Sequence, residues 1–270
     1  MPNYVETENE RQYHQLVVKS NDMIQKATNN LTATQQKLVA YAISKIRPDD
    51  KEFQFYEIRV DEFCAAVGKN KAWFYQEFKN IVDDMDSRAS IWIETDDVVT
   101  KFRFFSEIEY LKGKGTIRVL FHSHLNRYLL QLSEHFTQYE LYNVLALKSK
   151  YSFSLFELLK SYSNMKIKRF DLDEFKRLVG AETDAYKNFS NFRSRVLEPA
   201  IKEINTYTEL NLEYETLTKG KKVVGIIFYI NKKTALGTRS SYLMTMDKIN
   251  SGTNQVAGQL NMQFKENDDV

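Results

Sequence analysis

Residues 60–68 read Val-Asp-Glu-Phe-Cys-Ala-Ala-Val-Gly, and residues 172–180 read Leu-Asp-Glu-Phe-Lys-Arg-Leu-Val-Gly. In both stretches an apolar residue precedes Asp-Glu-Phe, and Val-Gly follows after three further residues. Solenoid repeats have periods of about 20–50 residues, and the spacing between these two copies is much longer. A repeat of this length indicates two copies of one small domain.

The sequence around each copy has the same order of expected elements. An amphipathic helix precedes the repeated helix, a second helix follows it, and β-rich sequence with a Lys/Gly turn comes last. This order is typical of a winged helix, so we predict an α+β protein with two tandem winged-helix domains related by an internal repeat. The expected division is an N-terminal arm (1–30), winged-helix domain 1 (31–133), winged-helix domain 2 (134–235) and a flexible polar tail (236–270).

Local signals predict the elements of each copy. Thr32 and Gln35 have capping-box spacing, and the helix that they open is expected to end before Pro48. Further elements of the first copy are expected at 53–60 (strand), 61–68 (helix), 71–85 (helix) and 90–121 (strands). Those of the second copy are expected at 139–147, 152–162, 171–180 and 187–205 (helices) and at 210–216 and 223–230 (a hairpin).

Composition narrows the class of protein. A chain of 270 residues with 43% hydrophobic residues is long enough for two packed domains. Its net charge of +2 says little about partners, because a bound phosphate responds to local charge. Cys64 is the single cysteine, so no internal disulfide forms; it aligns with Lys176, which suggests an edge position. With neither a signal peptide nor a membrane span expected, we predict a cytoplasmic protein.

The helix expected over 187–205 is the best candidate for reading DNA bases. No acidic residue lies between Asp184 and Glu198, and the buried stripe turns short polar and basic side chains outward. Arg and Asn are the side chains that pair with guanine and adenine edges, whereas Ser and Lys more often hold phosphates. Pro199 is expected to bend this helix. The predicted base-reading residues are Lys187, Asn188, Ser190, Asn191, Arg193, Ser194 and Arg195.

Two further basic surfaces are expected to bind the DNA backbone. The hairpin turn of the second copy carries Lys219, Lys221 and Lys222, which we interpret as a wing. The first copy has a weaker surface, interrupted by Glu77, that we expect to position the protein on DNA. Its residues are Lys69 and Asn70 just before the third helix, Lys71, Tyr75, Gln76 and Lys79 on it, and Lys112 and Lys114 on the wing.

One pattern suggests an enzyme. His122-Ser123-His124 lies at the end of an expected strand, where residues i and i+2 share a face and can bind one metal. Rolling-circle nucleases use a His-hydrophobic-His pair, but the middle residue here is Ser and no third ligand is evident. No Walker loop, dinucleotide fingerprint, zinc spacing or nucleophile elbow is present. We therefore expect a protein that is not an enzyme and uses neither cofactor nor metal.

Over roughly residues 16–232 the chain resembles the replication-initiator (Rep) proteins of iteron-containing, theta-replicating plasmids. Three stretches carry the resemblance: Val17-Val18-Lys19-Ser20-Asn21, Leu147 to Leu159, and Phe192-Arg193-Ser194-Arg195-Val196-Leu197-Glu198-Pro199 with Ala200 to Asn205. The resemblance implies two winged-helix domains that bind one iteron. Monomers would help melt the origin and load host replication proteins such as the helicase or its loader. Dimers formed through domain 1 would repress the initiator's own promoter.

Residue by residue, the base-reading helix of the family falls on 186–196, with Arg193 and Arg195 as the strongest correspondences. Members often carry Arg where this chain has Ser154, so any contact of that Arg is in doubt here. The alternative function is a winged-helix transcriptional repressor without a replication role. A repressor usually has one winged helix per subunit and reads an inverted repeat as a dimer, whereas two domains in one chain suit a direct repeat. A remoter alternative is a metal-dependent nuclease built on His122 and His124.

Overall fold

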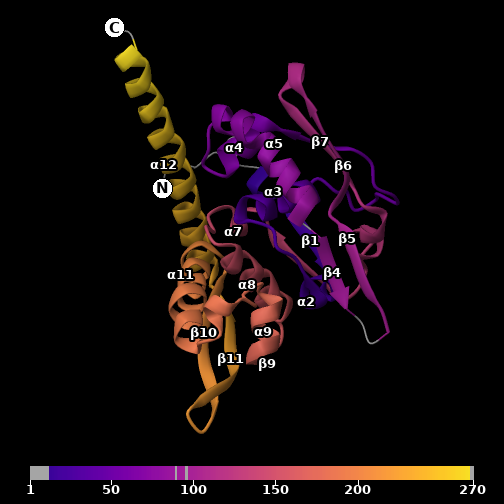
Figure 1. Ribbon diagram of the computed structural model, residues 1–270, viewed down its shortest axis with the longest axis vertical. Helices are drawn as coiled ribbons and strands as arrows, with labels where there is room; N and C mark the ends of the chain where they lie inside the picture. The colour runs from indigo at the N-terminus through magenta and orange to yellow at the C-terminus, as the bar shows by residue number, and fades with distance from the viewer. Residues whose placement is uncertain (1–11, 89, 95–96, 268–270) are drawn as a thin grey trace.

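The computed structural model describes residues 12–88, 90–94 and 97–267. Two mixed α/β units pack against each other, and the long C-terminal helix α12 (Ala235–Asn267) runs along both of them (Figure 1). In Figure 1 the first unit is indigo to magenta and the second is salmon to orange. Each unit contains one copy of the repeated helix.

The first unit contains the expected helices and strands of the first copy, with additional short elements at its N-terminal end. The bounds in this half of the chain are η1 Gln12–His14, β1 Leu16–Ser20, α2 Asn21–Lys26, β2 Ala27–Thr28, α3 Ala33–Ile43, β3 Tyr56–Arg59, α4 Val60–Ala66, α5 Lys71–Arg88, β4 Ser90–Glu94, β5 Val99–Arg103, β6 Phe105–Leu111, η2 Lys112–Lys114, β7 Thr116–Phe121, η3 Ser123–Leu125 and α6 Asn126–Leu129.

The second unit begins after β8 and α7, which connect it to the first unit. The bounds in this half are β8 Phe136–Glu140, α7 Tyr142–Leu145, α8 Lys150–Ser161, β9 Ile167–Asp171, α9 Leu172–Leu178, η4 Asp184–Tyr186, α10 Phe189–Phe192, the π-helical segment η5 Arg193–Leu197, α11 Glu198–Tyr207, β10 Leu210–Lys219, β11 Lys222–Lys232 and α12.

The internal repeat is present in three dimensions. In the first unit β3 pairs antiparallel with β7, and β7 pairs with β6; in the second, β9 pairs with β11, and β11 pairs with β10. Each unit therefore runs helix, strand, helix, helix and hairpin, which is the winged-helix fold. The repeated helices α4 and α9 both end at a glycine in the left-handed region, Gly68 at φ +67° and Gly180 at φ +72°. This is the backbone conformation of a helix C-terminus that glycine adopts without strain.

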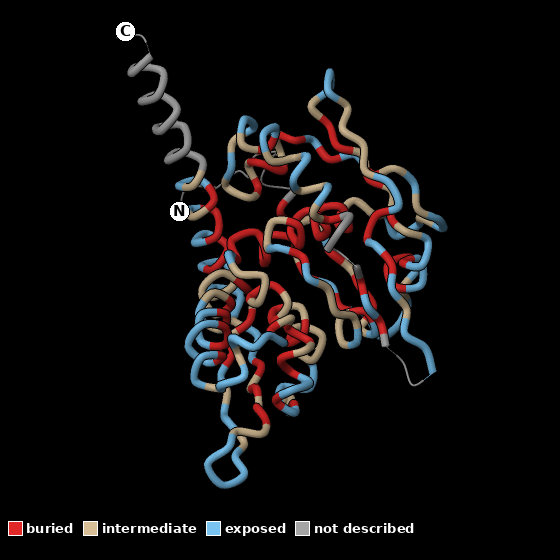
Figure 2. Tube along the Cα trace, in the orientation of Figure 1, coloured by how far each residue is buried: buried red, intermediate tan, exposed pale blue. Residues whose placement is uncertain are grey.

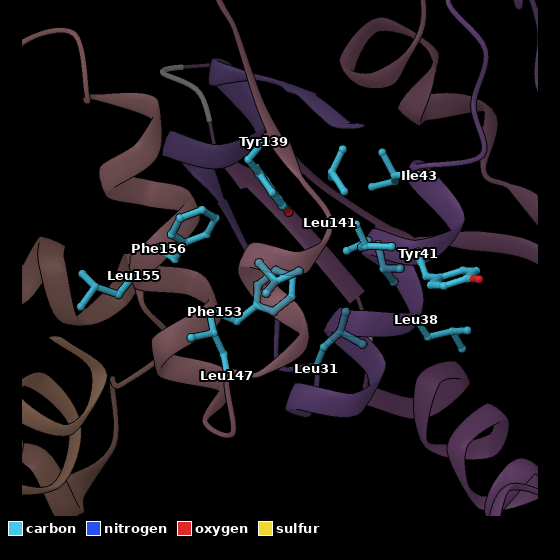
Figure 3. Packing of buried hydrophobic residues seen from close by; sticks show 14 of the residues in the cluster. Leu31, Leu38, Tyr41, Ile43, Tyr139, Leu141, Leu147, Phe153, Leu155 and Phe156 are labelled. Atoms are coloured by element: carbon cyan, nitrogen blue, oxygen red, sulfur yellow. The ribbon is translucent and has the colours of Figure 1, made fainter. Parts of the chain in front are cut away.

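Helix α3 begins where the capping box predicts. The Thr32 hydroxyl accepts from the backbone N–H of Gln35 (3.3 Å), and the Gln35 side chain accepts from the Thr32 N–H (2.8 Å). The helix ends at Ile43, before Pro48. Its buried face packs against α8, so that the cores of the two units are continuous (Figures 2 and 3).

The expectation of an extended arm over 1–30 is wrong for the residues that the structure describes. Tyr13, Val17 and Met23 are buried, and β1 pairs along its whole length with β8, from Leu16 with Glu140 onward. The apolar run in β1 is too short to stand out in a polar segment, and only pairing with a distant strand buries it. Residues 1–11 lie outside the described part of the chain.

The pairing of β1 with β8 also corrects the start of the second copy. The sequence pattern predicts one helix over 139–147, whereas residues 136–140 form β8 and only 142–145 are helical. The predicted boundary between residues 133 and 134 separates the two strands of one sheet. A buried ion pair crosses this region, from Lys19 on β1 to Glu157 on α8 (2.6 Å), and the Tyr139 hydroxyl also donates to Glu157.

The flexible tail expected over 236–270 is wrong for its described residues, which form α12 as far as Asn267. Tyr242, Met246 and Ile249 are buried, and their spacing places them on one face of the helix. That face packs on α7, α11 and α4. These three buried residues alone make a weak helical pattern, and neighbouring elements supply the surface that stabilises the helix.

Candidate nucleic-acid interface

The element expected to read bases is a helix with an irregular middle. Asn188 caps α10, accepting from the N–H of Ser190 (2.8 Å). A π-helical segment over 193–197 follows, and α11 starts at Glu198 with Pro199 in its first turn. A proline ring clashes with the carbonyl four residues before it, and the wider π turn lies where that carbonyl would be. At the place where a bend is expected, the structure thus has a π segment, a kind of irregularity that recurs at functional sites.

One face of this helix is buried and the other is exposed. Phe192, Val196, Ala200 and Ile204 are buried, and Phe192 contacts Phe175 of α9 edge-on. Phe189 and Ile201, which have the same helical spacing, are half-buried. All seven predicted base-reading residues are exposed, namely Lys187, Asn188, Ser190, Asn191, Arg193, Ser194 and Arg195.

The seven side chains differ in how free they are to contact DNA. Arg195 has no hydrogen bond or ion pair within the described part of the chain, so its guanidinium is available to a base pair or phosphate. Arg193 lies 3.6 Å from Glu198, whose carboxylate also accepts from the Tyr214 hydroxyl (3.3 Å). Glu198 thus orients the Arg193 side chain, which lies on the flank of the helix.

The other residues of this face contact their own turn. The Asn188 side-chain oxygen serves as the helix cap, so bidentate pairing with adenine, which needs that oxygen, competes with the cap. The Asn191 amide is not used in this way. Lys187 pairs with Asp184 (2.9 Å), and the Ser194 hydroxyl donates to the Asn191 carbonyl (3.5 Å). Arg195 and Asn191 are the most accessible candidates for base contacts.

A buried lysine contacts the segment that precedes this helix. Lys176 on α9 is buried; its Nζ donates to the Tyr186 carbonyl (2.8 Å) and lies 5.4 Å from the ring centroid of Phe192. Cys64, the equivalent residue of the first unit, is also buried, and burial raises the pKa of its thiol to about 12. The expected edge position is therefore wrong for both. Sequence reasoning missed the role of Lys176 because its long side chain reaches a loop that the first unit lacks.

The wing tips are exposed lysine-bearing turns. Lys219, Lys221 and Lys222 surround Gly220, whose φ of +62° closes the β10–β11 turn. Lys112 and Lys114 lie in the equivalent turn, which Gly115 closes at φ +59°. The two hairpin tips point to opposite ends of the molecule (Figure 1).

The third helix of the first unit, α5, offers a more neutralised surface. Asn70 caps it, accepting from the Trp73 N–H (2.7 Å), and Lys71 pairs with Asp61 (3.4 Å). Lys69 lies over the Trp73 ring at 5.3 Å from its centroid. Lys71, Gln76 and Lys79 are exposed along this helix, with the half-buried Glu77 between them.

Helix α5 and its wing are in contact. The exposed ring of Tyr75 packs on Tyr110 of β6 at 5.8 Å between centroids, and a Cβ built on Gly115 would lie 3.5 Å from the Tyr75 hydroxyl oxygen. The structure therefore places Tyr75 of α5 against the β6–β7 hairpin that carries the wing of the first unit.

The histidine pair packs as a cluster of rings. His122 stacks on Phe102 and His124 meets the same ring edge-on, while the His122 Nδ1 accepts from the His124 N–H (3.2 Å). No cluster of three or more His, Cys, Asp or Glu residues suited to a metal ion occurs among the described residues. Within the same residues, no helix has both the length and the apolar character of a membrane span.

Ser154, where family members often carry Arg, faces another helix of the protein. Its hydroxyl accepts from the Gln36 side-chain amide of α3 (3.1 Å). The residue therefore links α8 to α3. A DNA contact is not expected from this position.

Two family models match consecutive parts of the chain. Residues 16–160 match the model of the first winged-helix domain (WH1) of initiator replication proteins, and residues 171–230 match that of the second (WH2). A replication initiation protein of Escherichia coli is 30% identical over 139 residues, which are 49% of this chain and 43% of that protein. A probable replication protein of Bifidobacterium longum is 26% identical over 136 residues, 50% of this chain and 45% of that protein.

Each of these two matches thus spans less than half the length of the relative. In fold, the chain is similar to Pi initiator protein crystallised with iteron DNA, with a TM-score of 0.67 and 21% identity over 82% of this chain and 99% of that one.

Proposed function

The chain belongs to the initiator replication protein family, and we propose that it binds direct repeats (iterons) at a plasmid origin, as a monomer, in the cytoplasm. The observation that carries the proposal is the pair of winged-helix units in one chain, each with basic side chains exposed on or beside its third helix and a lysine-tipped wing. Two such helices can enter successive major grooves, which are about 34–36 Å apart on one face of DNA. The similarity in fold to an initiator crystallised with iteron DNA supports the same interpretation.

In this proposal the two domains have different tasks. Arg195, Asn191 and Arg193 of domain 2 read base edges, and the surface of α5 with Lys112 and Lys114 positions domain 1 on the backbone. The bound monomers promote melting of the adjacent DNA and recruit the host helicase or its loader. A dimer formed through domain 1 represses the initiator's own promoter. The protein acts by binding and not by catalysis.

A footprint on the DNA that flanks its own gene, paired with sedimentation of the complex, tests the proposal. Protection of tandem direct repeats of about 20 base pairs, with one monomer on each, supports an initiator, because two grooves on one face are covered. Protection of one inverted repeat by a dimer supports the alternative, a winged-helix repressor. Nicking of supercoiled origin DNA in the presence of manganese would contradict the proposal that the protein is not an enzyme.

A further inference from the structure

A cavity of about 500 Å³ lies where α12 crosses from one winged-helix domain to the other. Its walls come from the start of α3, the end of α4, the segment between α7 and α8, and α12. The helix and α4 touch through glycine: a Cβ on Gly252 would lie 3.1 Å from the Gly68 carbonyl oxygen, and one on Gly68 would lie 3.2 Å from the Ile249 carbonyl oxygen. The cavity therefore borders both domains and α12.

Four lysines line this cavity, one from each wall: Lys37 of α3, Lys69 after α4, Lys148 before α8 and Lys248 of α12. In the described part of the chain, none of the four forms an ion pair with a carboxylate. Lys69 and Lys148 are exposed, and Lys248 donates to the Ala146 carbonyl (2.6 Å) while its Nζ lies 3.8 Å from the Tyr207 ring centroid.

Lys37 has the least favourable surroundings of the four. Its exposed fraction is 9%, and within the described residues its ammonium group has no hydrogen-bond partner. Burial lowers its pKa to about 8, and the positive charges of Lys248, Lys69 and Lys148 add to this effect. Ammonium groups in protein interiors are normally paired, so an unpartnered one at the wall of a cavity indicates that a ligand completes the site.

The acid of this region does not neutralise the cluster. Glu203 of α11 acts on Lys37 only through its charge, and its carboxylate accepts from the backbone N–H groups of Lys148 (3.0 Å) and Ser149 (3.5 Å). The four lysines therefore present an excess of positive charge to the cavity. Multiple ammonium donors around a concave site are suited to a phosphate group, which has three acceptor oxygens and up to two negative charges.

We propose that this interdomain cavity binds a phosphate group through Lys37, Lys69, Lys148 and Lys248. The phosphate can come from a small free phosphate compound or from the backbone of bound DNA, and only the second source rests on the proposed origin binding. Because the four lysines belong to both domains and to α12, a bound phosphate fixes the orientation of one domain relative to the other.

The free source is tested by calorimetric titration of the full chain with inorganic pyrophosphate in a phosphate-free buffer. Wild-type protein is expected to bind one equivalent, and Lys37→Met, which retains an unbranched side chain in the buried position, is expected to weaken binding at least about tenfold. The double variant Lys69→Gln/Lys148→Gln changes only exposed side chains, so it tests the same site without affecting the core. Lys202→Met, an exposed change on α11, is the matched control and is expected to bind as wild type.

The DNA source is tested with the same variants and a duplex from the origin. If the cavity holds a backbone phosphate, Lys37→Met reduces the slope of log K against log salt by about 0.9, equally on origin and random DNA, and pyrophosphate does not bind. The absence of both a pyrophosphate isotherm and a change in slope would overturn the proposal. That outcome would not contradict origin binding, which is tested separately by the comparison of Arg195→Ala on origin and random DNA.

Discussion

The two winged-helix domains share one framework but approach their third helix differently. In domain 1, residues 69–70 connect the glycine that ends α4 to α5, whereas in domain 2 residues 181–188 lie between the equivalent glycine and α10. One of the differences between the two copies of the repeat provides a contact to this longer segment. Where domain 1 has Cys64, domain 2 has Lys176, whose ammonium group reaches the Tyr186 carbonyl.

The third helices of the two domains also differ in how far their positive charges are neutralised. On α5, Lys71 is paired with Asp61 and Glu77 lies among the lysines, whereas the exposed face over 187–195 contains no acid and presents an unpaired Arg195. A helix that only positions the protein on DNA can have its cationic side chains in local ion pairs, because a contact with any backbone phosphate is sufficient. A helix that reads bases needs free donors. One fold, used twice in a chain, can in this way separate affinity from sequence recognition.

The largest expected effect concerns the aromatic residue that anchors each third helix. Phe74 and Phe192 have an exposed fraction of 0%, so replacing either with Ala is expected to lower the free energy of unfolding by about 3–5 kcal/mol. Urea denaturation followed by circular dichroism measures this decrease. Because α12 and a continuous core join the domains, each variant is expected to unfold in one transition. Two separate transitions would show that the domains are independent.

Arg195→Ala is expected to have the next largest effect. It should cost about 1–3 kcal/mol in binding to the origin, because Ala cannot form the forked hydrogen bonds to a base edge, and much less on random DNA. Lys79→Ala in domain 1 is the matched control and is expected to weaken both equally. Fluorescence anisotropy with both duplexes measures the ratio, and equal decreases for Arg195→Ala would contradict its assignment to base reading.

Lys176→Met tests the hydrogen bond from Lys176 to the Tyr186 carbonyl, which has no counterpart in domain 1. Removal of a charged donor to the Tyr186 carbonyl is expected to lower the free energy of unfolding by about 1–2 kcal/mol and to weaken origin binding, because the segment before α10 is no longer held. Lys202→Met should leave both unchanged. If Lys176→Met lowers stability but binds the origin as wild type does, the segment's position is independent of Lys176.

The smallest effects are expected at the wings. Lys221→Ala and Lys112→Ala should each weaken binding to origin and random DNA alike and reduce the dependence of log K on log salt by about 0.9 for each phosphate that the lysine no longer neutralises. Titrations at several salt concentrations measure this slope. Weakening confined to origin DNA for Lys221→Ala would assign base reading to the wing as well.

Much of the fold follows from local patterns. The capping box at Thr32, the left-handed glycines at 68 and 180, and the alternation in the hairpins are signals that act within a few residues. The wrong predictions concern segments that depend on distant partners: β1 pairs with a strand more than a hundred residues later, and α12 is stabilised by surfaces on both domains. Short amphipathic patterns do not specify such partners.

The repeat, the two hairpins and the outward face of the helix that we propose reads bases could all be predicted from the order of residues, because periodicity and turn chemistry are local properties of the chain. Three features could not: Lys176 reaches across a loop, Asn188 uses its side-chain oxygen as a cap, and four lysines from separate elements share one cavity. The first and third depend on distances between residues far apart in the chain, and the second on where the irregular helix begins. The packing of helices and strands sets these distances and this boundary, and the spacing of residues in the sequence does not contain them.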